Sequence, residues 1–542
     1  MLFGPNNAGK SNIISAIDRA LGERWPLTTE FEDSDYFMRD KDAYPESDIQ
    51  IDFDETYFTD RYGRQYKSVV LHYESDQSKS QFRDISGNRL YVNSPSRAAI
   101  QSYLVDAERD ISRQLSYYSR YSLLSKFAHA VHKSLDDADR ESLETAYGAI
   151  KNTFQGVPKY SEFFDNFHEV MEGSVKGFVH DLKVDFSAYD PNNFARSMRV
   201  VAYEGESARS FEEFGTGEQQ ILLMAFAKAY VQTFSSGSLV LIIEEPEAHL
   251  HPLAQRWLKE YIYDMCGDGL QVILSTHSPD FLDVSNLDGL VRVRKDDAGI
   301  TSVVQVTKKQ LVSLCLETGV PQDRISEDNV LDFFGTKLFP DESKGFFATK
   351  VLLVEGATEY YALPELMGKL GHSLTQVGTE IVIANGKNAM PLYWRIFSAF
   401  EIQCACLFDG DSKNRKESER DNAQLSSVLK VNIQKIADGL QQELYISDGF
   451  AFFRTDFEHF MRSSISSYAS REQEVRDVYH ITSKPGVARA VCRKIDASEL
   501  PEEIDQLWQD VIAPTPTTTE INDETSLSQN DQDDWYSQDI PF

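Results

Sequence analysis

The octapeptide Gly4-Pro5-Asn6-Asn7-Ala8-Gly9-Lys10-Ser11 decides how the first half of this 542-residue sequence is interpreted. It fits the pattern G-x-x-x-x-G-K-[ST], and a helical pattern at 12–21 follows it directly. Glycines in such a loop let backbone N–H groups surround phosphates, while the lysine reaches the outer phosphates and the hydroxyl holds Mg²⁺. We therefore predict an ATP-binding phosphate loop with Ser11 as a Mg²⁺ ligand. Its candidate residues are Gly4, Asn6, Asn7, Ala8, Gly9, Lys10 and Ser11.

An acidic motif farther along the chain suits the same chemistry. The apolar run 239–243 ends in Glu244-Glu245-Pro246-Glu247, which places carboxylates at the carboxyl edge of a buried strand. We expect Glu244 to support the Mg²⁺ and Glu245 to activate water for attack on the γ-phosphate. The simpler alternative is a helix cap after a buried strand, which does not require two acids in tandem.

Two further motifs complete a resemblance to ABC-type ATPases. The segment Phe214-Gly215-Thr216-Gly217-Glu218 precedes an apolar helical pattern at 221–231 and resembles the signature motif of that class. His277 follows a strand-like run at 271–274 and falls where the class keeps its switch histidine. The resemblance implies that Gly215 and Gly217 of one subunit close on nucleotide held by another, and hence a homodimer or higher homo-oligomer. Taken singly, Gly215 could be a helix cap and His277 a core residue.

The start of the chain departs from that class. Only Met1, Leu2 and Phe3 precede Gly4, whereas ABC-type heads have a strand before the loop and usually further strands upstream. We therefore expect the N-terminal strands of the head to be missing and ATP binding to be weak.

A second acidic site follows two other apolar runs. Val351–Val354 leads into Glu355, with Glu359 one helical turn later, and 403–408 leads into Asp409-Gly410-Asp411. Alternate residues of an extended segment point the same way, so Asp409 and Asp411 can converge on one cation. Such hard oxygen ligands suit Mg²⁺ or Mn²⁺, and two such ions would support phosphodiester cleavage. Each acid taken singly could instead be a helix cap or a loop residue.

The pattern E-G-x-x-E followed by D-x-D resembles the Toprim domain of topoisomerases, primases and related nucleases. An ABC-type ATPase head with a helical insert, followed by a Toprim domain, is the layout of the OLD (overcoming lysogenization defect) family of ATP-dependent nucleases, and the Gabija nuclease subunit shares it. The resemblance implies ATP and Mg²⁺ as cofactors (Mn²⁺ or Ca²⁺ as alternatives in the second site), DNA as substrate, a second defence-system protein as partner and a role in anti-phage defence.

The same resemblance implies roles for particular residues. It implies Glu355 as a metal ligand and general base, with Glu359, Asp409 and Asp411 as further ligands. It also implies a later acid, for which we choose Glu458 over Asp456, and a lysine at Lys484 that neutralises charge on the scissile phosphate. The alternative is that Glu458 and Lys484 are ordinary surface residues. The resulting catalytic set is Glu355, Asp409, Asp411 and Lys484 in the second site and Glu245 in the first.

Changes of pattern predict an α/β protein with six segments. The ATPase head comprises 1–96 and 189–304, interrupted by a helical dimerisation insert at 97–188 that lacks strand signals. A helical connector at 305–346 leads to the Toprim domain at 347–510. The last segment, 511–542, is acidic and polar, and its composition predicts disorder.

Charge and cysteine content exclude other classes. The net charge of −32 rules out a chain that coats nucleic acid by bulk charge, although bound metal ions can supply local positive charge. The candidate basic contacts to DNA, or solvated surface residues, are Lys387, Lys413, Arg415, Lys416, Arg454 and Arg462. Five cysteines without CxxC pairs, and no long apolar run, predict a cytoplasmic protein with reduced thiols and no membrane partner.

The chain ends in Asp539-Ile540-Pro541-Phe542, which resembles the tip of bacterial single-stranded DNA-binding proteins. Our hypothesis is that this tail binds a pocket meant for such tips, or folds over the chain's own site; a simple solubilising end is the alternative. For the whole chain we predict nucleotide-regulated, metal-dependent DNA cleavage. The alternative is an ATP-dependent DNA-binding or sensor protein with a non-cutting Toprim domain. A topoisomerase or primase is disfavoured, because neither a nucleophilic-tyrosine motif nor a primase zinc motif is evident.

Overall fold

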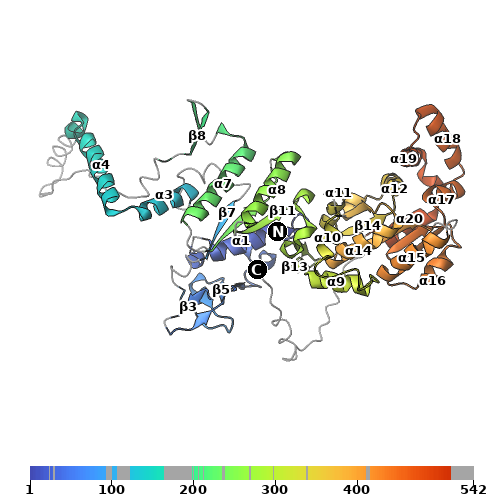
Figure 1. Cartoon of the computed structure of the whole chain (residues 1–542), viewed down its shortest axis with the longest axis horizontal. Coiled ribbons are helices and arrows are strands. Elements are labelled where there is room, and N and C mark those ends of the chain that lie inside the picture. The colour runs from blue at the N-terminus through green and yellow to red at the C-terminus, as the bar shows by residue number, and fades with distance from the viewer. Residues whose placement is uncertain are drawn as a thin grey trace.

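The computed structural model (Figure 1) is an α/β protein with an arm of helices at one end and a second α/β unit at the other. It describes residues 1–22, 25–28, 31–60, 62–92, 100–105, 122–163, 198, 200–204, 207–210, 213–234, 238–248, 250–267, 270–296, 298–336, 338, 340–410 and 415–513. The C-terminal Asp-Ile-Pro-Phe segment therefore lies outside the described residues. None of the described helices is long and apolar enough to cross a lipid bilayer.

The first sheet has six strands in the order β13-β12-β1-β11-β10-β7. Their bounds are β1 Leu2–Phe3, β7 Ile100–Val105, β10 Ser238–Glu244, β11 Gln271–Thr276, β12 Val291–Lys295 and β13 Thr301–Gln305. All neighbours run parallel except the antiparallel pair β12 and β13. The strand before the phosphate loop is short but present, because β1 pairs with both β11 and β12 in the middle of the sheet.

Helices cover both faces of this sheet, as expected for buried parallel strands. They are α1 Lys10–Leu21, α7 Thr216–Phe234 and α8 Pro252–Gly267. Alternate residues of β10 point to opposite faces. Val240 and Ile242 pack with α1 residues, whereas Leu241 and Ile243 pack with residues of α7 and α8. The continuous apolar run at 239–243 is explained by burial on both sides.

One expectation about the insert is wrong. Residues 100–105 were expected to lie in a helical insert without strands, but they form β7, which pairs in parallel with β10 at the edge of the head sheet. The described helices of the insert are α3 Leu123–Ser134 and α4 Asp137–Gln155. The ring of Phe127 in α3 packs edge-on against Phe226 and Phe234 of α7, while α4 projects away from the head (Figure 1).

Antiparallel strands form smaller sheets beside the first. The strands are β2 Glu46–Asp52, β3 Phe58–Thr59, β4 Gln65–Tyr66, β5 Ser68–Glu74, β6 Gln81–Arg83, β8 Val201–Glu204 and β9 Ser207–Ser210. β2, β5 and β6 make one sheet, and β3–β4 and β8–β9 are separate pairs. Side chains of β2 alternate between exposed and half-buried, whereas the middle of β5 is buried on both faces.

The second large sheet has the order β15-β14-β16-β18-β17. Its strands are β14 Lys350–Val354, β15 Thr379–Ile383, β16 Gln403–Asp409, β17 Leu444–Ser447 and β18 Phe450–Phe453. Only β17 is antiparallel to its neighbour, so the carboxyl ends of β14, β15, β16 and β18 share one edge. This edge carries the second candidate site.

Helices precede and surround this sheet. The connector holds α9 Lys308–Glu317, α10 Val330–Gly335 and α11 Pro340–Ser343. The remaining helices are α12 Ala357–Lys369, α13 Leu374–Val377, α14 Met390–Ala399, α15 Arg415–Val428, α16 Ile433–Gly439, α17 Phe457–Ser464, α18 Tyr468–Tyr479, α19 Lys484–Lys494 and α20 Glu502–Leu507. One face of the sheet packs on α14 and α15, and the other on α12, α17, α19 and α20.

The two α/β units share a core. The buried ring of Phe3, the residue before the phosphate loop, lies 5.7 Å from the ring of Phe346 and 5.6 Å from that of Phe400, both edge-on. The buried guanidinium of Arg292 in β12 donates to the carbonyl oxygens of Phe400 and Glu401, each at 2.9 Å. The strand that carries the phosphate loop is thus packed directly on the second unit.

Candidate nucleotide and metal sites

The phosphate loop joins β1 to α1, and its glycines are required by the backbone. Gly4 has φ +145°, and a Cβ there would lie 2.1 Å from the carbonyl oxygen of Val293. Gly9 has φ +106°, and a Cβ would lie 2.5 Å from Oγ1 of Thr301. A side chain at either position would clash and strain the loop. The spacing of the motif is therefore imposed by the close approach of β12 and β13.

Lys10 is folded back onto its own loop. Its Nζ donates to the carbonyl oxygens of Gly4 (2.9 Å) and Pro5 (3.0 Å), and the side chain is only 5% exposed. Burial lowers the pKa of Lys10 to about 8, although the charges of Glu245 and Glu247 act in the opposite direction. Phosphate oxygens would have to replace these carbonyl oxygens when nucleotide binds. Ser11 is exposed in the first turn of α1.

His277 lies between the lysine and the predicted water-activating acid. Its Nδ1 is 3.5 Å from Nζ of Lys10, and its Nε2 is 3.1 Å from a carboxylate oxygen of Glu245. Burial and the Lys10 charge lower the pKa of His277, and Glu245 partly offsets this. The structure thus brings Lys10, Glu245 and His277 together from three segments, with Glu244 ending β10 beside them.

Glu247 has a positioning role that the sequence analysis missed. Its Oε1 accepts hydrogen bonds from the Thr276 hydroxyl (2.8 Å) and from the backbone N–H of His277 (2.6 Å). These bonds fix the loop that carries the histidine. The signal was present, because Glu247 follows Glu244-Glu245-Pro246 in the same acidic motif.

The signature motif lies at the start of α7. The N–H of Gly215 donates to a carboxylate oxygen of Glu218 at 3.3 Å. A Cβ on Gly217 would come within 2.4 Å of a methyl group of Leu250, so this glycine permits close packing near the acidic motif. Closure of Gly215 and Gly217 on a second subunit's nucleotide stays a prediction.

The second site forms where β14 and β16 end side by side. Oε2 of Glu355 accepts the backbone N–H of Asp409 at 3.1 Å. Glu359 lies in the first turn of α12, is 5% exposed, and accepts the N–H of Gly356 at 3.2 Å. Glu458 lies in α17, the helix that follows β18, and it accepts a 3.5 Å hydrogen bond from the Thr358 hydroxyl. Four predicted ligands therefore lie near one sheet edge, although within the described part of the chain no three of them bring ligand atoms within 4.8 Å of one another.

The electrostatics of this edge favour bound cations. Burial, with the charges of Glu359 and Glu355, raises the pKa of Asp409 to about 8, and Lys484 acts in the opposite direction. Burial and the neighbouring Glu458 and Glu355 raise the pKa of Glu359 to about 7. Oδ1 of Asp409 is buried and has no hydrogen-bond partner among the described residues. Hard carboxylate oxygens, with Oδ1 of Asp409 unbonded among the described residues, are the kind of ligand that suits Mg²⁺ or Mn²⁺.

Two other predicted residues stand at the margin of this site. Nζ of Lys484, at the start of α19, lies 2.9 Å from Oε2 of Glu458. Asp456 caps α17 by accepting the N–H of His459, which supports the choice of Glu458 over Asp456 as the inward-facing acid. Asp411, the second acid of D-x-D, lies outside the described residues.

Lys387 has a position that neither interpretation of it predicted. It is 4% exposed, and its Nζ donates to the carbonyl oxygen of Asp409 at 2.6 Å. It is therefore neither a surface contact for DNA nor a solvated residue, but an internal cation beside the acids. It follows β15, so its place at the same sheet edge was the available signal.

The remaining basic candidates divide between paired and undescribed side chains. Arg454 pairs with Glu443, and Arg462 pairs with Glu472. The side chains of Lys413, Arg415 and Lys416 lie outside the described residues.

Gly410, between the two acids of D-x-D, has no room for a side chain, because a Cβ would lie 2.6 Å from the carbonyl oxygen of Phe453.

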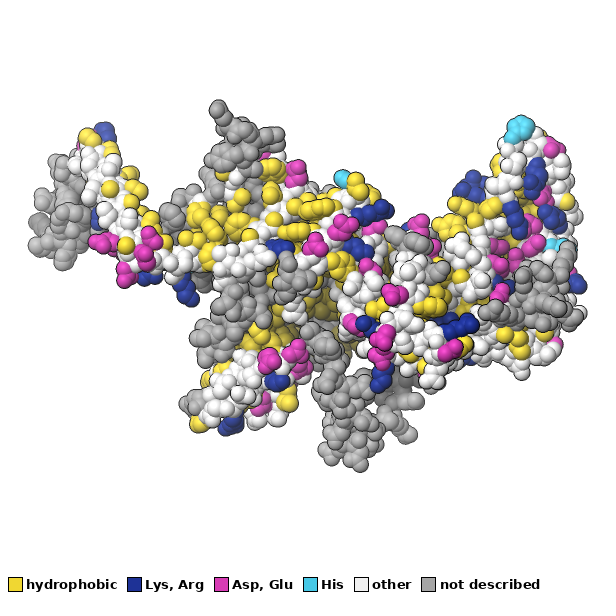
Figure 2. Space-filling view, viewed as in Figure 1, with side chains coloured by type: hydrophobic (Ala, Val, Ile, Leu, Met, Phe, Trp, Pro, Cys, Tyr) yellow, Lys and Arg dark blue, Asp and Glu magenta, His cyan; other side chains and the backbone are white. Residues whose placement is uncertain are grey.

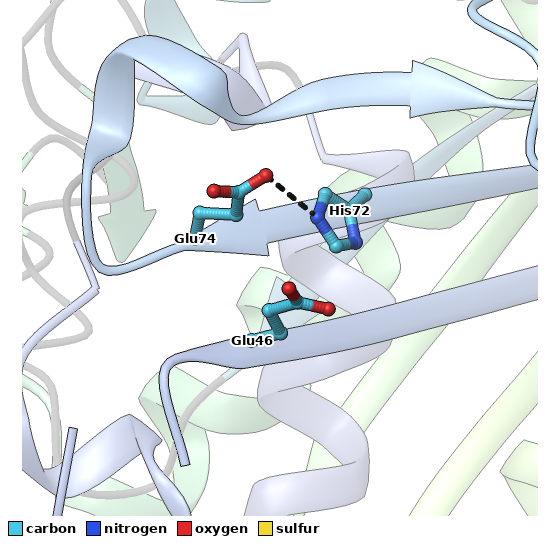
Figure 3. Close-up of side chains that lie close together, drawn as sticks. All are labelled: Glu46, His72 and Glu74. Atoms are coloured by element: carbon cyan, nitrogen blue, oxygen red, sulfur yellow. Dashed lines mark hydrogen bonds and ion pairs between the residues drawn. The ribbon is translucent and has the colours of Figure 1, made fainter. Parts of the chain in front are cut away.

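A separate group of potential ligands lies on β2 and β5 (Figure 3). Glu46, His72 and Glu74 offer ligand atoms within 4.8 Å of one another. However, the buried His72 already bonds Asp48 through Nδ1 (2.7 Å) and Glu74 through Nε2 (3.2 Å). Arg83 also lies 3.8 Å from the same Glu74 oxygen. These protein contacts give the group a structural role in joining the two strands.

Comparison with known families agrees with this architecture. Residues 1–283, more than half of the chain, match the family described as "AAA domain, putative AbiEii toxin, Type IV TA system". Residues 346–411 match "Overcoming lysogenization defect protein-like, TOPRIM domain". The phosphate-loop head followed by this acidic sheet edge defines an ATPase–Toprim protein. The chain belongs to the OLD family of such proteins.

Two curated relatives carry the family name. The OLD nuclease of Thermus scotoductus is 26% identical over 448 residues, which cover 78% of this chain and 81% of that protein. The Old nuclease of Escherichia phage P2 is 28% identical over 210 residues, 38% of this chain and 34% of that protein. The solved C-terminal region of the Burkholderia pseudomallei OLD protein is 16% identical, covers 30% of this chain and 96% of that chain, and has a TM-score of 0.24.

Proposed function

We propose that this OLD-family nuclease cleaves DNA by using divalent cations held at its Toprim edge, and that nucleotide in the head regulates the cleavage. The observation that carries the proposal is that an oxygen of Asp409, beside Glu355 and Glu359, is buried with no hydrogen-bond partner in the described part of the chain. Glu355, Glu359, Asp409 and Glu458 would hold the cations, with Asp411 as a further ligand. Bound Mg²⁺ or Mn²⁺ would stabilise the attacking and leaving oxygens of phosphodiester displacement.

The chain's own residues would orient and polarise the substrate. Lys484 is half-exposed at the margin of the site, where its ammonium can approach a scissile phosphate and neutralise its charge. Glu355 is the proposed general base, because the Asp409 amide fixes one of its oxygens at the sheet edge. Lys387 holds the Asp409 backbone from inside, so the carboxylate keeps its place when substrate enters.

Nucleotide binding would act through the head. ATP with Mg²⁺ at Ser11 and Glu244 would draw Lys10 away from its loop carbonyls and change its contact with His277. Oligomerisation through the insert is part of the proposal: α4 exposes Ile150 and Phe154, four residues apart on a helix that projects from the head. A cytoplasmic role in anti-phage defence, with a second defence protein, follows from the family layout alone.

Plasmid cleavage tests the nuclease. The purified chain is incubated with supercoiled plasmid in EDTA, Mg²⁺ or Mn²⁺, with and without ATP. We expect cutting only with the cations, and a loss on the order of 100-fold or more in Asp409→Asn, as for loss of a ligand to a catalytic metal. The matched control is Asp438→Asn, which changes an exposed acid of α16 and should cut like the wild type.

Two results would contradict the nuclease. Equal cutting by Asp409→Asn and wild type would show that the acids at the ends of β14 and β16 do not take part in cleavage. Absence of cutting by a wild-type chain that still binds DNA would favour the alternative, a nucleotide-dependent DNA-binding or sensor protein.

A further inference from the structure

A pocket of about 240 Å³ opens beside the acidic site, among α17, α18 and α19. Glu458 and Lys484 line both the site and the pocket. The far wall carries Arg462, Tyr468, Glu472 and Arg476, which we call the arginine cluster. Figure 2 shows Lys and Arg side chains, mixed with acidic ones, on the projecting part of the molecule that holds these helices.

One carboxylate holds both guanidinium groups of the arginine cluster. Arg462 donates from Nε and Nη2 to the two oxygens of Glu472, at 2.8 and 3.0 Å, and Arg476 donates to one of them at 3.1 Å. Glu472 is mostly buried, whereas both arginines are partly exposed toward solvent. The pocket lining balances three basic side chains (Arg462, Arg476 and Lys484) with three acids (Asp456, Glu458 and Glu472), and the guanidinium N–H groups that Glu472 does not use are available to a planar or tetrahedral anion.

Tyr468 adds a buried hydroxyl group to the lining of this pocket. Tyr468 is fully buried, and its hydroxyl oxygen has no hydrogen-bond partner within the part of the chain that the structure describes. An unmade hydrogen bond of a buried hydroxyl is unfavourable, so an incoming acceptor would be stabilised there. Burial, with nearby Cys492 and Glu458, raises the pKa of Tyr468, so the phenol keeps its proton and can donate it.

We propose that the arginine cluster binds a backbone phosphate of the substrate DNA adjacent to the one that is cut. This inference rests on the proposed nuclease function, because the pocket is continuous with Glu458 and Lys484. Its volume is well above the ~10–15 Å³ that a single water molecule needs. Glu472 takes the place of the phosphate in the free protein, and the bound phosphate receives hydrogen bonds from Arg462, Arg476 and the Tyr468 hydroxyl.

Two substitutions with opposite expected signs test the proposal. Both are made in the full-length Asp409→Asn chain, so that a labelled DNA duplex is bound and not cut, and Kd is measured by fluorescence anisotropy at several salt concentrations. Tyr468→Phe removes only a hydroxyl, and we expect the Kd to rise about tenfold while the Tm stays the same or rises. Glu472→Gln removes the competing carboxylate, and we expect the Kd to fall about threefold to tenfold.

A matched pair of arginine variants covers the case in which Tyr468→Phe unfolds. Arg476→Gln should weaken binding and reduce the salt dependence by about one phosphate contact. Arg493→Gln also removes one positive charge, but at the end of α19, where Arg493 pairs with Glu365. It should leave the salt dependence of Kd unchanged. Identical slopes for the two variants would overturn the proposal.

The Kd values of Tyr468→Phe and Glu472→Gln can each contradict the proposal. An unchanged Kd in a folded Tyr468→Phe chain, or binding by Glu472→Gln that is no tighter, would show that the arginine cluster is only a structural ion-pair group. Because binding is measured without cleavage, failure of the wild-type chain to cut plasmid would contradict the proposed nuclease and not these Kd values.

Discussion

Asp409 is a carboxylate that the fold holds against electrostatic repulsion. Its Oδ1 is buried without a partner among the described residues, and the charges of Glu359 and Glu355 act on it. Burial and these neighbouring charges raise its pKa to about 8, so the metal-free folded protein must either bury a charge or take up a proton, and both are unfavourable at neutral pH. Natural proteins keep such unfavourable residues mainly where function requires them, so the residue is better explained by a cation than by stability.

This reasoning gives a prediction about stability that is independent of cutting. In EDTA at pH 7, Asp409→Asn should leave the free energy of unfolding unchanged or raise it by about 1–2 kcal/mol, because the amide needs neither a buried charge nor an added proton in the folded state. Mg²⁺ should raise the Tm of the wild type and raise that of the variant less, since fewer ligands bind the ion. Thermal unfolding with and without Mg²⁺ measures both effects, with Asp438→Asn as control. A variant that is less stable in EDTA and gains as much from Mg²⁺ would contradict it.

At the scale of elements, the sequence predicted those site residues that directly follow a buried strand. The apolar runs before Glu355 and Asp409 mark β14 and β16, and parallel neighbours must end at one edge. The strand β7 was missed because its sequence, Ile-Gln-Ser-Tyr-Leu-Val, mixes polar and apolar residues and its identity depends on pairing with β10. Tyr468 was missed as a site residue because only tertiary contacts place it beside the acids, whereas Lys387 was expected at the surface although its position after β15 indicated the sheet edge.

The contact between α12 and α19 carries a prediction about pH. Oε1 of Glu365 in α12 accepts hydrogen bonds from Arg489 (3.0 Å) and Arg493 (2.8 Å) of α19. Partial burial would raise the pKa of Glu365, but these two bonds lower it below its ordinary value. A carboxylate with a lowered folded pKa stabilises the protein above its unfolded pKa of about 4.3, and this stabilisation is lost as pH falls through the folded pKa.

Glu365→Gln should therefore lower the free energy of unfolding by at most about 1 kcal/mol at pH 7, because its partners are partly exposed. The difference from the wild type should shrink as pH falls below about 4.3. Chemical denaturation at pH 7, 5, 4 and 3 measures it. Glu503→Gln, an exposed acid of α20, is the control and should show no such trend. If the difference in the free energy of unfolding grows as the pH falls, the predicted direction of the pH dependence is wrong.

At the scale of the whole molecule, the phosphate loop and the Toprim edge belong to one packed body. Phe3 ends the strand that leads into the loop, and it packs on Phe346 and Phe400 of the Toprim unit. Arg292, on the neighbouring strand, is buried and bonds three carbonyl oxygens of that unit, those of Ala348, Phe400 and Glu401. A change in the loop on nucleotide binding therefore has a direct route through packed side chains and hydrogen bonds.

Arg292→Met tests that route. Methionine fills similar space but leaves the three carbonyl oxygens without this donor, so we expect a loss of about 1–3 kcal/mol in stability. Each unit keeps its own sheet and core, so metal-dependent cutting should persist, but the ratio of cleavage rates with and without ATP should move to about 1. The control is Arg294→Met, which removes a half-exposed ion pair with Glu401 and should keep the wild-type ratio. An unchanged ratio in a folded Arg292→Met chain would contradict coupling through this contact, and a wild-type ratio of 1 would contradict nucleotide regulation itself.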